Sequence, residues 1–263
     1  MSKLFKKIAD TATNAIDKIT LKHFKPMTTA IITVGGSGKR MENVDGTTKQ
    51  FMELNGLSIV VRTVLEFEKS PYIDEIIIVS KEDEIDLYTK MIEDYSLSKV
   101  RRIVKGGSTR QESVLNGFKA ISEKCEYVAI HDGVRCLITQ ENIKAVMKTA
   151  YATNCACAAT KIYDTLKMAD SDMYIDSTPD RSKAWAAQTP QVFKSDIYRA
   201  CAFSAKKEGL SVTDDCMLVE YYGFKIKLVD CGRNNIKITT KDDLVIAEAI
   251  LNSRNTNAEG ENL

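Results

Sequence analysis

The stretch Ile31-Ile-Thr-Val-Gly-Gly-Ser-Gly-Lys-Arg40 decides how the rest of the chain is interpreted. Its first residues belong to an apolar run from Ala30 to Val34, which is typical of a short buried strand. Three glycines and two adjacent cations follow. Glycine lets a backbone approach a ligand closely, and successive bare N–H groups in such a turn form an anion-binding hollow. Because a further cation, Lys49, follows on the same connection, the pattern predicts a polyphosphate site at the end of a strand.

Length and composition are those of an ordinary globular protein. The 263 residues suffice for one large domain, or for one domain with an appendage. Hydrophobic residues make up 44%, no apolar run has the length of a membrane span, and no signal peptide is visible. The net charge of +1 gives no reason to expect nucleic acid as a partner. Seven cysteines, most of them in apolar runs, predict reduced, buried thiols in a cytoplasmic protein.

Short apolar segments alternate with helical patterns along most of the chain. This alternation predicts an α/β fold whose mostly parallel sheet is covered by helices on both faces. The expected strands are 29–34, 75–80, 101–104, 127–131, 155–161 and 225–229. The expected helices are 58–69, 83–94, 109–123, 140–152, 194–207, 213–222 and 241–251. Ligands bind beyond the carboxyl ends of such strands, so the loops 35–40, 106–113 and 131–135 should share one rim.

Three segments stand apart from this alternation. Residues 1–26 combine an apolar helical face with six lysines, which suits a helix lying on an anionic membrane or one packed against protein. We favour packing, because the apolar face is weak and rich in alanine. The main domain would span 27–252, with a polar, turn-rich arm projecting at about 162–187. Residues 253–263 are polar and should form a frayed tail.

Local patterns give further expectations. Ser108-x-x-Gln111 and Thr240-x-x-Asp243 have the spacing of helix capping boxes. The run Thr213–Asp215 should cap a helix and support the rim instead of binding substrate. We expect His131 at the rim, hydrogen-bonded to backbone. With only two histidines in the chain, a histidine-based metal site is not expected.

The glycine loop does not match two common phosphate-binding templates. A P-loop needs glycine where Thr33 stands and a hydroxyl where Arg40 stands. The dinucleotide pattern G-x-G-x-x-G needs its third glycine where Met41 stands. An NTPase and a dinucleotide oxidoreductase are therefore disfavoured, which leaves nucleotidyl transfer, where a triphosphate must be held and its charge neutralised.

The chain resembles the 2-C-methyl-D-erythritol 4-phosphate cytidylyltransferase family along most of residues 28–252. The motifs that carry the resemblance are Gly35-Gly-Ser-Gly-Lys-Arg-Met41, Lys49-Gln-Phe51, Gly106-Gly-Ser-Thr-Arg-Gln-Glu-Ser-Val114, His131-Asp-Gly-Val-Arg135, Asp164-Thr-Leu-Lys167, Gln188-Thr-Pro-Gln191, Thr213-Asp-Asp215 and Asn235-Ile-Lys-Ile-Thr239. It implies a Rossmann-like homodimer with interlocking arms. It also implies CTP and a sugar-alcohol phosphate as substrates, Mg²⁺ as the metal, and release of pyrophosphate.

The resemblance also assigns roles to individual residues. Arg40, Lys49 and Lys237 would hold the triphosphate and stabilise the charge that develops at its α-phosphate. The nucleotide would be bound by Gly35, Gly36, Ser37, Gly38, Gly107, Ser108 and Ser113. The second substrate would be gripped by Arg135, Thr165 and Arg181, the last two reaching from the arm into the neighbouring subunit.

Asp132 is the expected metal ligand. A carboxylate directly after an apolar strand is costly to bury without a cation, and Mg²⁺ is often held by one carboxylate plus substrate phosphates. Asn234 stands where many family members have aspartate, so a second metal carboxylate would be missing. Two alternatives stay open. Transfer to ribitol 5-phosphate belongs to a sister family that lacks Lys167 and the Arg-Gln-x-Ser pattern at 110–113, and a non-catalytic CTP-binding protein would bind without turnover.

Overall fold

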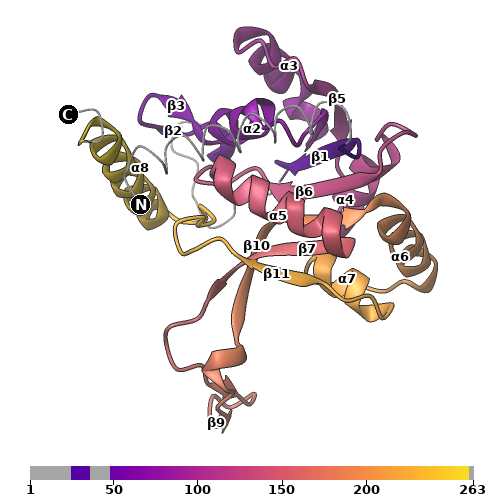
Figure 1. Ribbon diagram of the computed structural model, residues 1–263, viewed down its shortest axis with the longest axis vertical. Helices are drawn as coiled ribbons and strands as arrows, with labels where there is room; N and C mark the ends of the chain where they lie inside the picture. Colours follow the sequence, from indigo (N-terminus) through magenta and orange to yellow (C-terminus); the bar gives the residue numbers. More distant parts are fainter. Residues whose placement is uncertain (1–24, 36–47, 261–263) are drawn as a thin grey trace, which may run out of the picture.

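The computed structural model describes residues 25–35 and 48–260. A seven-stranded sheet runs through its centre in the order β11-β7-β10-β6-β1-β4-β5 (Figure 1). Neighbouring strands are parallel except at β10, which is antiparallel to both β6 and β7. The strands of this sheet are β1 (Thr28–Thr33), β4 (Glu75–Ser80), β5 (Val100–Lys105), β6 (Tyr127–Asp132), β7 (Cys155–Lys161), β10 (Trp185–Lys194) and β11 (Lys227–Asp230).

Helices and short elements connect these strands. The α-helices are α2 (Ile59–Lys69), α3 (Ile85–Asp94), α4 (Arg110–Lys119), α5 (Gln140–Thr153), α6 (Ser195–Glu208), α7 (Asp215–Tyr221) and α8 (Lys241–Gly260). Single 3-10 turns are η1 (Lys49–Phe51), η2 (Glu82–Glu84) and η3 (Arg181–Lys183). Two small hairpins pair β2 (Glu53–Leu54) with β3 (Leu57–Ser58) and β8 (Met168–Ala169) with β9 (Ile175–Ser177). Of the helices in these two described ranges, none is long and apolar enough to cross a membrane.

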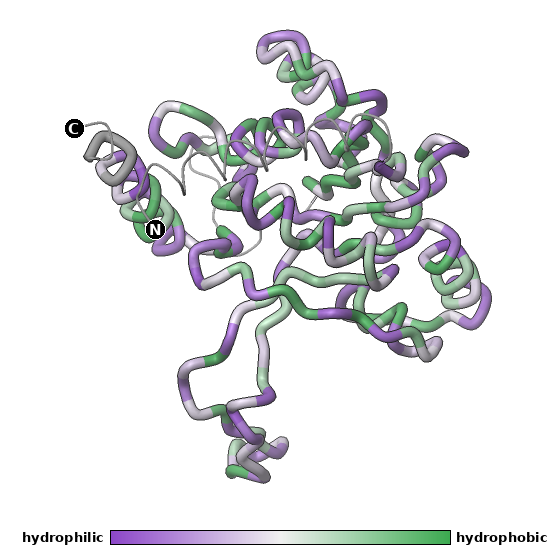
Figure 2. The backbone as a smooth tube through the Cα atoms, in the orientation of Figure 1, coloured by the Kyte–Doolittle hydropathy of each residue, from purple (hydrophilic) through white to green (hydrophobic). Residues whose placement is uncertain are grey.

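Side chains of the strands alternate between two cores, one on each face of the sheet. Ala30 and Ile32 of β1 belong to a buried cluster with α2, α3 and α5. Ile31 between them belongs to a second cluster with α4, α6 and α7. Figure 2 shows the hydrophobic residues concentrated in the body of the molecule. The predicted α/β fold, with a mostly parallel sheet covered on both faces, is therefore confirmed.

The strand β10 was not predicted from the sequence. Residues up to 187 were assigned to the arm, no strand was expected at 188–194, and proline is rare inside central strands. In the structure the pairing of β10 with β7 is interrupted between Ala187 and Gln191. Pro190 therefore lies where the ladder needs no N–H donor. The polar side chains of this strand are buried but hydrogen-bonded to other parts of the chain, as described below.

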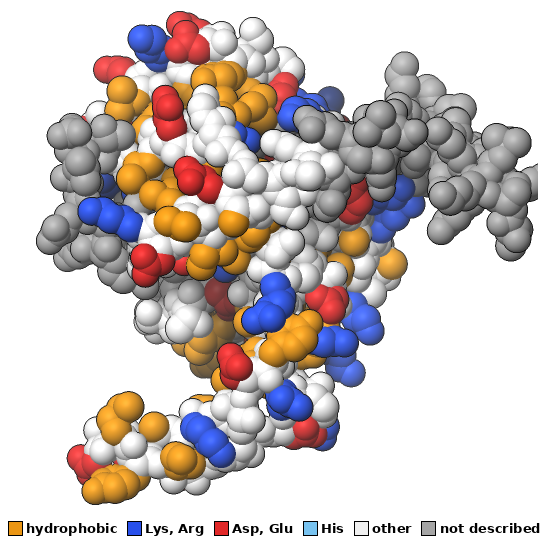
Figure 3. All heavy atoms as spheres, turned by 90° about the vertical axis from the view of Figure 1, so that its left-hand side faces the viewer, with side chains coloured by type: hydrophobic (Ala, Val, Ile, Leu, Met, Phe, Trp, Pro, Cys, Tyr) orange, Lys and Arg blue, Asp and Glu red, His pale blue; other side chains and the backbone are white. Residues whose placement is uncertain are grey.

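The segment between β7 and β10 projects from the body as an arm (Figure 1). It contains β8, β9 and η3, and most of its residues are exposed. Figure 3 shows hydrophobic side chains on this projection. The large exposed hydrophobic residues of the arm are Tyr163, Met168, Met173, Tyr174 and Ile175. A single chain thus leaves apolar side chains in water that a partner surface can cover.

The C-terminal segment corrects one prediction. A frayed tail was expected from residue 253, but α8 continues to Gly260. Side chains beyond Leu251 attach the helix to the body: Asn252 accepts a hydrogen bond from Asn55, and Arg254 donates to the carbonyl of Leu137 at 2.9 Å. Such long-range contacts stabilise a helix whose sequence is too polar to predict one. The leader expected over 1–26 lies, except for its last two residues, outside the described residues.

Candidate active site

The carboxyl ends of the parallel strands form the rim on which the candidate site is built. Gly35 follows β1 after one residue, Gly106 follows β5 directly, and Asp132 ends β6. Backbone hydrogen bonds join these ends: Gly106 donates to the carbonyl of Ser80 at 2.8 Å, and Gly133 donates to that of Thr33 at 2.9 Å. The three rim loops expected from the sequence are therefore held side by side where the structure describes them.

Asp132 is the centre of a charged cluster on this rim. Its side chain is only 9% exposed, yet three cations surround it. Lys237 Nζ lies 2.9 Å from Oδ2, Arg135 Nε lies 3.5 Å from the same oxygen, and Arg110 Nε lies 3.5 Å from Oδ1. Burial opposes the charged carboxylate, but the nearby Lys237, Arg110 and Arg135 hold the pKa of Asp132 well below its usual range. The cluster carries an excess of positive charge, which suits binding of a polyphosphate.

Lys237 reaches the rim because the loop before α8 is tied to β10. The side-chain amide of Asn235 donates to Gln188 Oε1 at 3.1 Å and to the carbonyl of Thr189 at 2.8 Å. Gln188 in turn donates to the carbonyl of Gly232 at 3.2 Å. These bonds satisfy the buried polar side chains of β10. They fix the loop so that Lys237, two residues after Asn235, points at Asp132.

Arg135 is also part of this framework. Its side chain is 13% exposed, and its Nη1 donates to the backbone carbonyl of Asn235 at 2.9 Å. The sequence predicted that Arg135 grips the second substrate. The structure places it beside Asp132 with most of its guanidinium buried, so it braces the Lys237 loop as well.

His131 lies below the rim, not on it. It is fully buried, packs with a ring-centroid distance of 4.7 Å against Phe67, and contacts Thr189 Oγ1 through Nδ1 at 3.0 Å. Its Nε2 contacts the carbonyl of Arg135 at 3.3 Å, so the expected backbone hydrogen bond is present. The predicted rim position is wrong, because the strand β6 stays fully buried up to Asp132.

The buried His131 gives a prediction for acid stability. Burial lowers the pKa of His131 from 6.5 to about 3. As the pH falls, His131 therefore becomes protonated near pH 6.5 in the unfolded chain but only near pH 3 in the folded chain. The free energy of unfolding is unaffected by this group above pH 6.5. It decreases as the pH falls below 6.5, by about 3 kcal/mol at pH 4. In urea unfolding curves at pH 7 and pH 4, His131→Gln should lose less stability than the wild type by about that amount. An equal loss in both proteins would contradict this assignment.

The loop after β5 is packed tightly against the start of α4. A Cβ on Gly107 would lie 2.3 Å from Cβ of Glu112, so only glycine fits there. The N–H of Gly107 donates to Ser113 Oγ, which donates to the carbonyl of Thr109. Gly107 and Ser113, both predicted to bind the nucleotide, are thus in direct contact. Ser113 therefore ties the loop after β5 to the start of α4.

The predicted capping box at Ser108 is wrong by one residue. The N-cap of α4 is Thr109, whose side chain accepts from the N–H of Glu112 at 3.1 Å. Glu112 reaches back to both the N–H and the hydroxyl of Ser108. Gln111 turns the other way and holds the segment after α6: it donates to the carbonyl of Leu210 and accepts from the N–H of Val212. The second box is confirmed, since Thr240 and Asp243 bond each other's backbone N–H groups.

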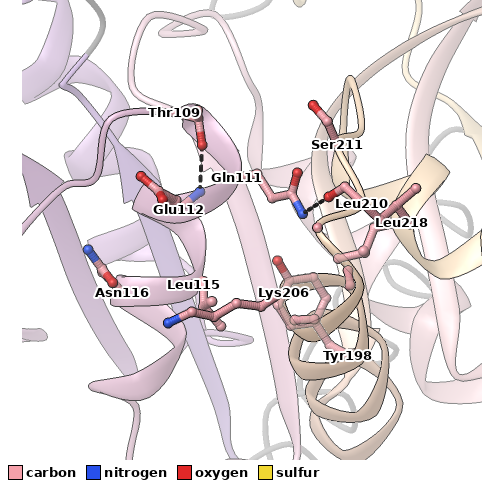
Figure 4. A pocket seen from close by; sticks show the side chains of 13 residues that line it. Thr109, Gln111, Glu112, Leu115, Asn116, Tyr198, Lys206, Leu210, Ser211 and Leu218 are labelled. Carbon is pink, nitrogen blue, oxygen red and sulfur yellow. Dashed lines mark hydrogen bonds between the residues drawn. The ribbon is translucent and has the colours of Figure 1, made fainter.

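A pocket of about 410 Å³ lies between α4 and α6. Figure 4 shows Gln111 and Tyr198 on its wall, with the hydrogen bonds from the N–H of Glu112 to the hydroxyl of Thr109 and from Gln111 to the carbonyl of Leu210. Asp132 and its cationic neighbours do not line this pocket. The pocket is adjacent to the loop after β5 through the first turn of α4, but it is separate from the charged cluster.

The start of α7 supports the rim, as the sequence predicted. Asp214 is the N-cap and accepts from the N–H of Met217 at 2.8 Å. Gln191 of β10 donates to Asp214 and accepts from the N–H groups of Asp215 and Cys216. Asp215 is buried, and Arg110 Nη1 lies 2.6 Å from its Oδ2. Arg110 was given no role from the sequence, because its partner Asp215 is 105 residues away in the chain.

The remaining predicted residues lie on the arm or near β1. Thr165 and Arg181 are exposed on the arm, where Arg181 Nη1 donates to the carbonyl of Tyr163 at 2.9 Å. Within one chain the arm projects away from the body (Figure 1). Lys49 begins η1 and is half-buried, and the adjacent Gln50 donates to the carbonyl of Val34 at the end of β1. Four residues of the glycine loop that were predicted to act, Gly36, Ser37, Gly38 and Arg40, lie outside the described residues.

The fold and the charged rim define a nucleotidyltransferase of the α/β class. Comparison with known proteins names the family. The family model for IspD, 2-C-methyl-D-erythritol 4-phosphate cytidylyltransferase, matches residues 28–253, and the chain belongs to this family.

Relatives at the level of sequence and structure agree with this membership. The 2-C-methyl-D-erythritol 4-phosphate cytidylyltransferase of Lachnospira eligens is 43% identical over 228 residues, 86% of this chain and 99% of that protein. That of Syntrophus aciditrophicus is 42% identical over 86% of this chain and 97% of its own length. The crystal structure of 4-diphosphocytidyl-2C-methyl-D-erythritol synthase from Anaerococcus prevotii matches with a TM-score of 0.76 at 34% identity, covering 86% of this chain and 98% of that one.

Proposed function

We propose that the cluster around Asp132 is where this family member transfers the cytidylyl group of CTP to 2-C-methyl-D-erythritol 4-phosphate. The products are 4-diphosphocytidyl-2-C-methyl-D-erythritol and pyrophosphate. The observation that carries the proposal is the excess of positive charge on the strand ends, where Lys237, Arg135 and Arg110 surround one buried carboxylate. Such a site attracts a triphosphate and a phosphate monoester together.

The residues of the rim can promote this reaction by positioning and charge alone. An oxygen of the acceptor phosphate attacks the α-phosphorus of CTP, and the bond from that phosphorus to the bridging oxygen of pyrophosphate breaks. The attacking oxygen is already ionised, so no general base is needed. Lys237 offers an ammonium where negative charge develops. Lys49, and Arg40 from the glycine loop, would hold the leaving phosphates.

Mg²⁺ fits this site as an ion that arrives with the nucleotide. Asp132 offers a hard oxygen ligand, and one carboxylate plus phosphate oxygens is a usual Mg²⁺ environment. Among residues 25–35 and 48–260, no group of three or more His, Cys, Asp or Glu side chains is arranged to hold a metal by itself. Asn234 adds no carboxylate. When bound, the ion would neutralise phosphate charge, while Asp132 would hold it and Lys237 would contact the phosphates.

We also propose a cytoplasmic homodimer formed through the arm. The exposed apolar side chains of the arm need a partner surface. The arm also carries Thr165 and Arg181 away from the body of their own chain, so in a dimer these two residues would reach the acceptor bound to the second subunit. The guanidinium of Arg181 would bind the acceptor phosphate in a bidentate manner.

The arm gives a prediction that separates the two substrates. Arg181→Ala should raise the KM for the acceptor by about tenfold or more, the usual loss when a charged hydrogen bond is removed. The KM for CTP should change by no more than about twofold, because Arg181 would contact the acceptor and not the nucleotide. Steady-state kinetics with each substrate varied in turn measure both values. Lys183→Ala, on the same exposed turn, is the matched control. Equal losses for both substrates would contradict the role of the arm.

The assignment of the acceptor is tested by direct competition. Purified protein is incubated with CTP, Mg²⁺ and equal amounts of 2-C-methyl-D-erythritol 4-phosphate and ribitol 5-phosphate, and the two cytidylyl products are separated. The proposal requires the methylerythritol product to dominate. Dominance of the ribitol product would reject the acceptor but keep cytidylyl transfer. CTP binding without pyrophosphate release from either acceptor would indicate a non-catalytic protein.

A further inference from the structure

Arg110 lies between two carboxylates and is held more closely by the one outside the reaction centre. Its Nη1 is 2.6 Å from Asp215 Oδ2, whereas its Nε is 3.5 Å from Asp132 Oδ1. A guanidinium prefers to form two parallel hydrogen bonds with a single carboxylate. Arg110 does not close on Asp132 in this way. Its side chain stays 30% exposed.

Asp215 is fixed strongly enough to hold Arg110 in place. Its side chain is 3% exposed, and Tyr198 donates to its Oδ1 at 2.8 Å. The N–H of Asp215 donates to Gln191 at 3.1 Å, which anchors the first turn of α7 to β10. The carboxylate therefore cannot follow Arg110 toward Asp132. A charge pair between buried groups is also screened little by solvent.

As a result, the two carboxylate oxygens of Asp132 have different contacts. Oδ2 is engaged by Lys237 at 2.9 Å and by Arg135 at 3.5 Å. Among the ion pairs of the described residues, Oδ1 has only the long contact to Arg110. If Arg110 closed on Asp132, both oxygens would be engaged, and a cation would have to displace a guanidinium before it could bind.

We infer that Asp215 is a positioning residue that holds Arg110 back from Asp132 and so keeps Asp132 Oδ1 open to the divalent cation carried by the nucleotide. This inference rests on the proposed function, in which the nucleotide binds as its metal complex. Asp215 touches neither substrate nor metal. Its effect is transmitted through Arg110 alone.

Mn²⁺ replaces Mg²⁺ as the probe, because free Mn²⁺ is counted directly by electron paramagnetic resonance. The affinity of the protein for Mn²⁺ is measured with CTP present and no acceptor, so turnover plays no part. Asp215→Asn keeps the shape and the contact to Tyr198 but removes the charge that holds Arg110. We expect Mn²⁺ to bind about tenfold more weakly, or worse, a change of about 1.4 kcal/mol. Asp214→Asn removes one carboxylate from the neighbouring position without touching Arg110, and should leave the Mn²⁺ affinity unchanged.

A double-mutant cycle shows whether the effect passes through Arg110. In an Arg110→Gln background, Asp215→Asn should have no further effect on the Mn²⁺ affinity. Persistence of the tenfold loss in that background, or an equal loss in Asp214→Asn, overturns the inference. So does an Mn²⁺ affinity that Asp215→Asn leaves intact, or a wild type that binds no Mn²⁺ with CTP.

Two milder variants keep the test decisive if Asp215→Asn does not fold. Asp215→Glu retains the charge and should keep the Mn²⁺ affinity near that of the wild type. Tyr198→Phe removes one anchor of Asp215 but keeps its charge and its backbone anchor to Gln191, so the Mn²⁺ affinity should fall by less than in Asp215→Asn. A tenfold loss in Tyr198→Phe would overturn the inference. Because no acceptor is present, failure of the proposed acceptor chemistry would show in the competition assay and not here.

Discussion

Lys237→Ala is expected to lower kcat by about 10²–10³-fold while the protein remains folded. Oxyanion-type stabilisation by one preorganised donor has this magnitude. Among the described residues, the ammonium of Lys237 is the cation nearest to Asp132, at 2.9 Å, and its side chain is 40% exposed. It can therefore contact a phosphate that enters the cluster. The fall should appear in kcat more than in the KM for CTP, because the interaction strengthens as charge develops in the transition state.

Three measurements support the interpretation of Lys237→Ala. Lys237→Arg keeps the positive charge and should recover part of kcat, although a guanidinium does not match the geometry of an ammonium. Lys227→Ala removes an exposed lysine of β11 and should have no effect. Thermal unfolding should change little in Lys237→Ala, because Arg110 and Arg135 still neutralise Asp132. A rise in KM at constant kcat would show that Lys237 only binds ground-state substrate.

The sequence predicted the strands best where their composition is uniform. The strands 75–80 and 155–161 coincide with β4 and β7, since continuous buried apolar runs can be recognised without knowledge of their neighbours. The strand β10 was missed because its burial depends on partners that are distant in the sequence. Gln188 and Gln191 are buried only because Asn235 and the start of α7 satisfy their side chains. A local sequence pattern cannot reveal hydrogen-bond partners that lie 24 and 47 residues away in the chain.

The same distinction between local patterns and distant partners applies to the candidate site. Asp132 was identified because a carboxylate after an apolar strand is unusual in itself. Its surroundings could not be predicted: the sequence assigned it a metal, whereas the structure adds Arg110, Arg135 and Lys237 around it. His131 was placed at the rim because strand ends cannot be located within one or two residues. The partnership of Arg110 with Asp215 joins α4 to α7, and only the packing of both helices on one face of the sheet brings them together.

Gly107→Ala is the second variant with a large expected effect. The added Cβ would lie 2.3 Å from Cβ of Glu112 and 3.2 Å from its backbone carbonyl carbon, so the loop must move. Neither neighbour can swing aside, because Glu112 is in the first turn of α4 and its N–H is bound to the cap Thr109. A displacement of the order of 1 Å in a positioning element can cost about 10²-fold in rate. We expect kcat/KM for CTP to fall by about that factor.

Gly35→Ala is the matched control for this prediction. A Cβ on Gly35 would lie 3.5 Å from the backbone of Ser80 and Lys81, which is ordinary van der Waals contact. The same added methyl group, also at the end of a strand on the same rim, should leave kcat/KM for CTP within about twofold, because no protein atom has to move and the backbone N–H through which residue 35 would bind the nucleotide is kept. The two variants distinguish a close approach of the backbone from a general need for glycine around a phosphate. If Gly107→Ala were as active as Gly35→Ala, the loop after β5 would not set the position of the nucleotide.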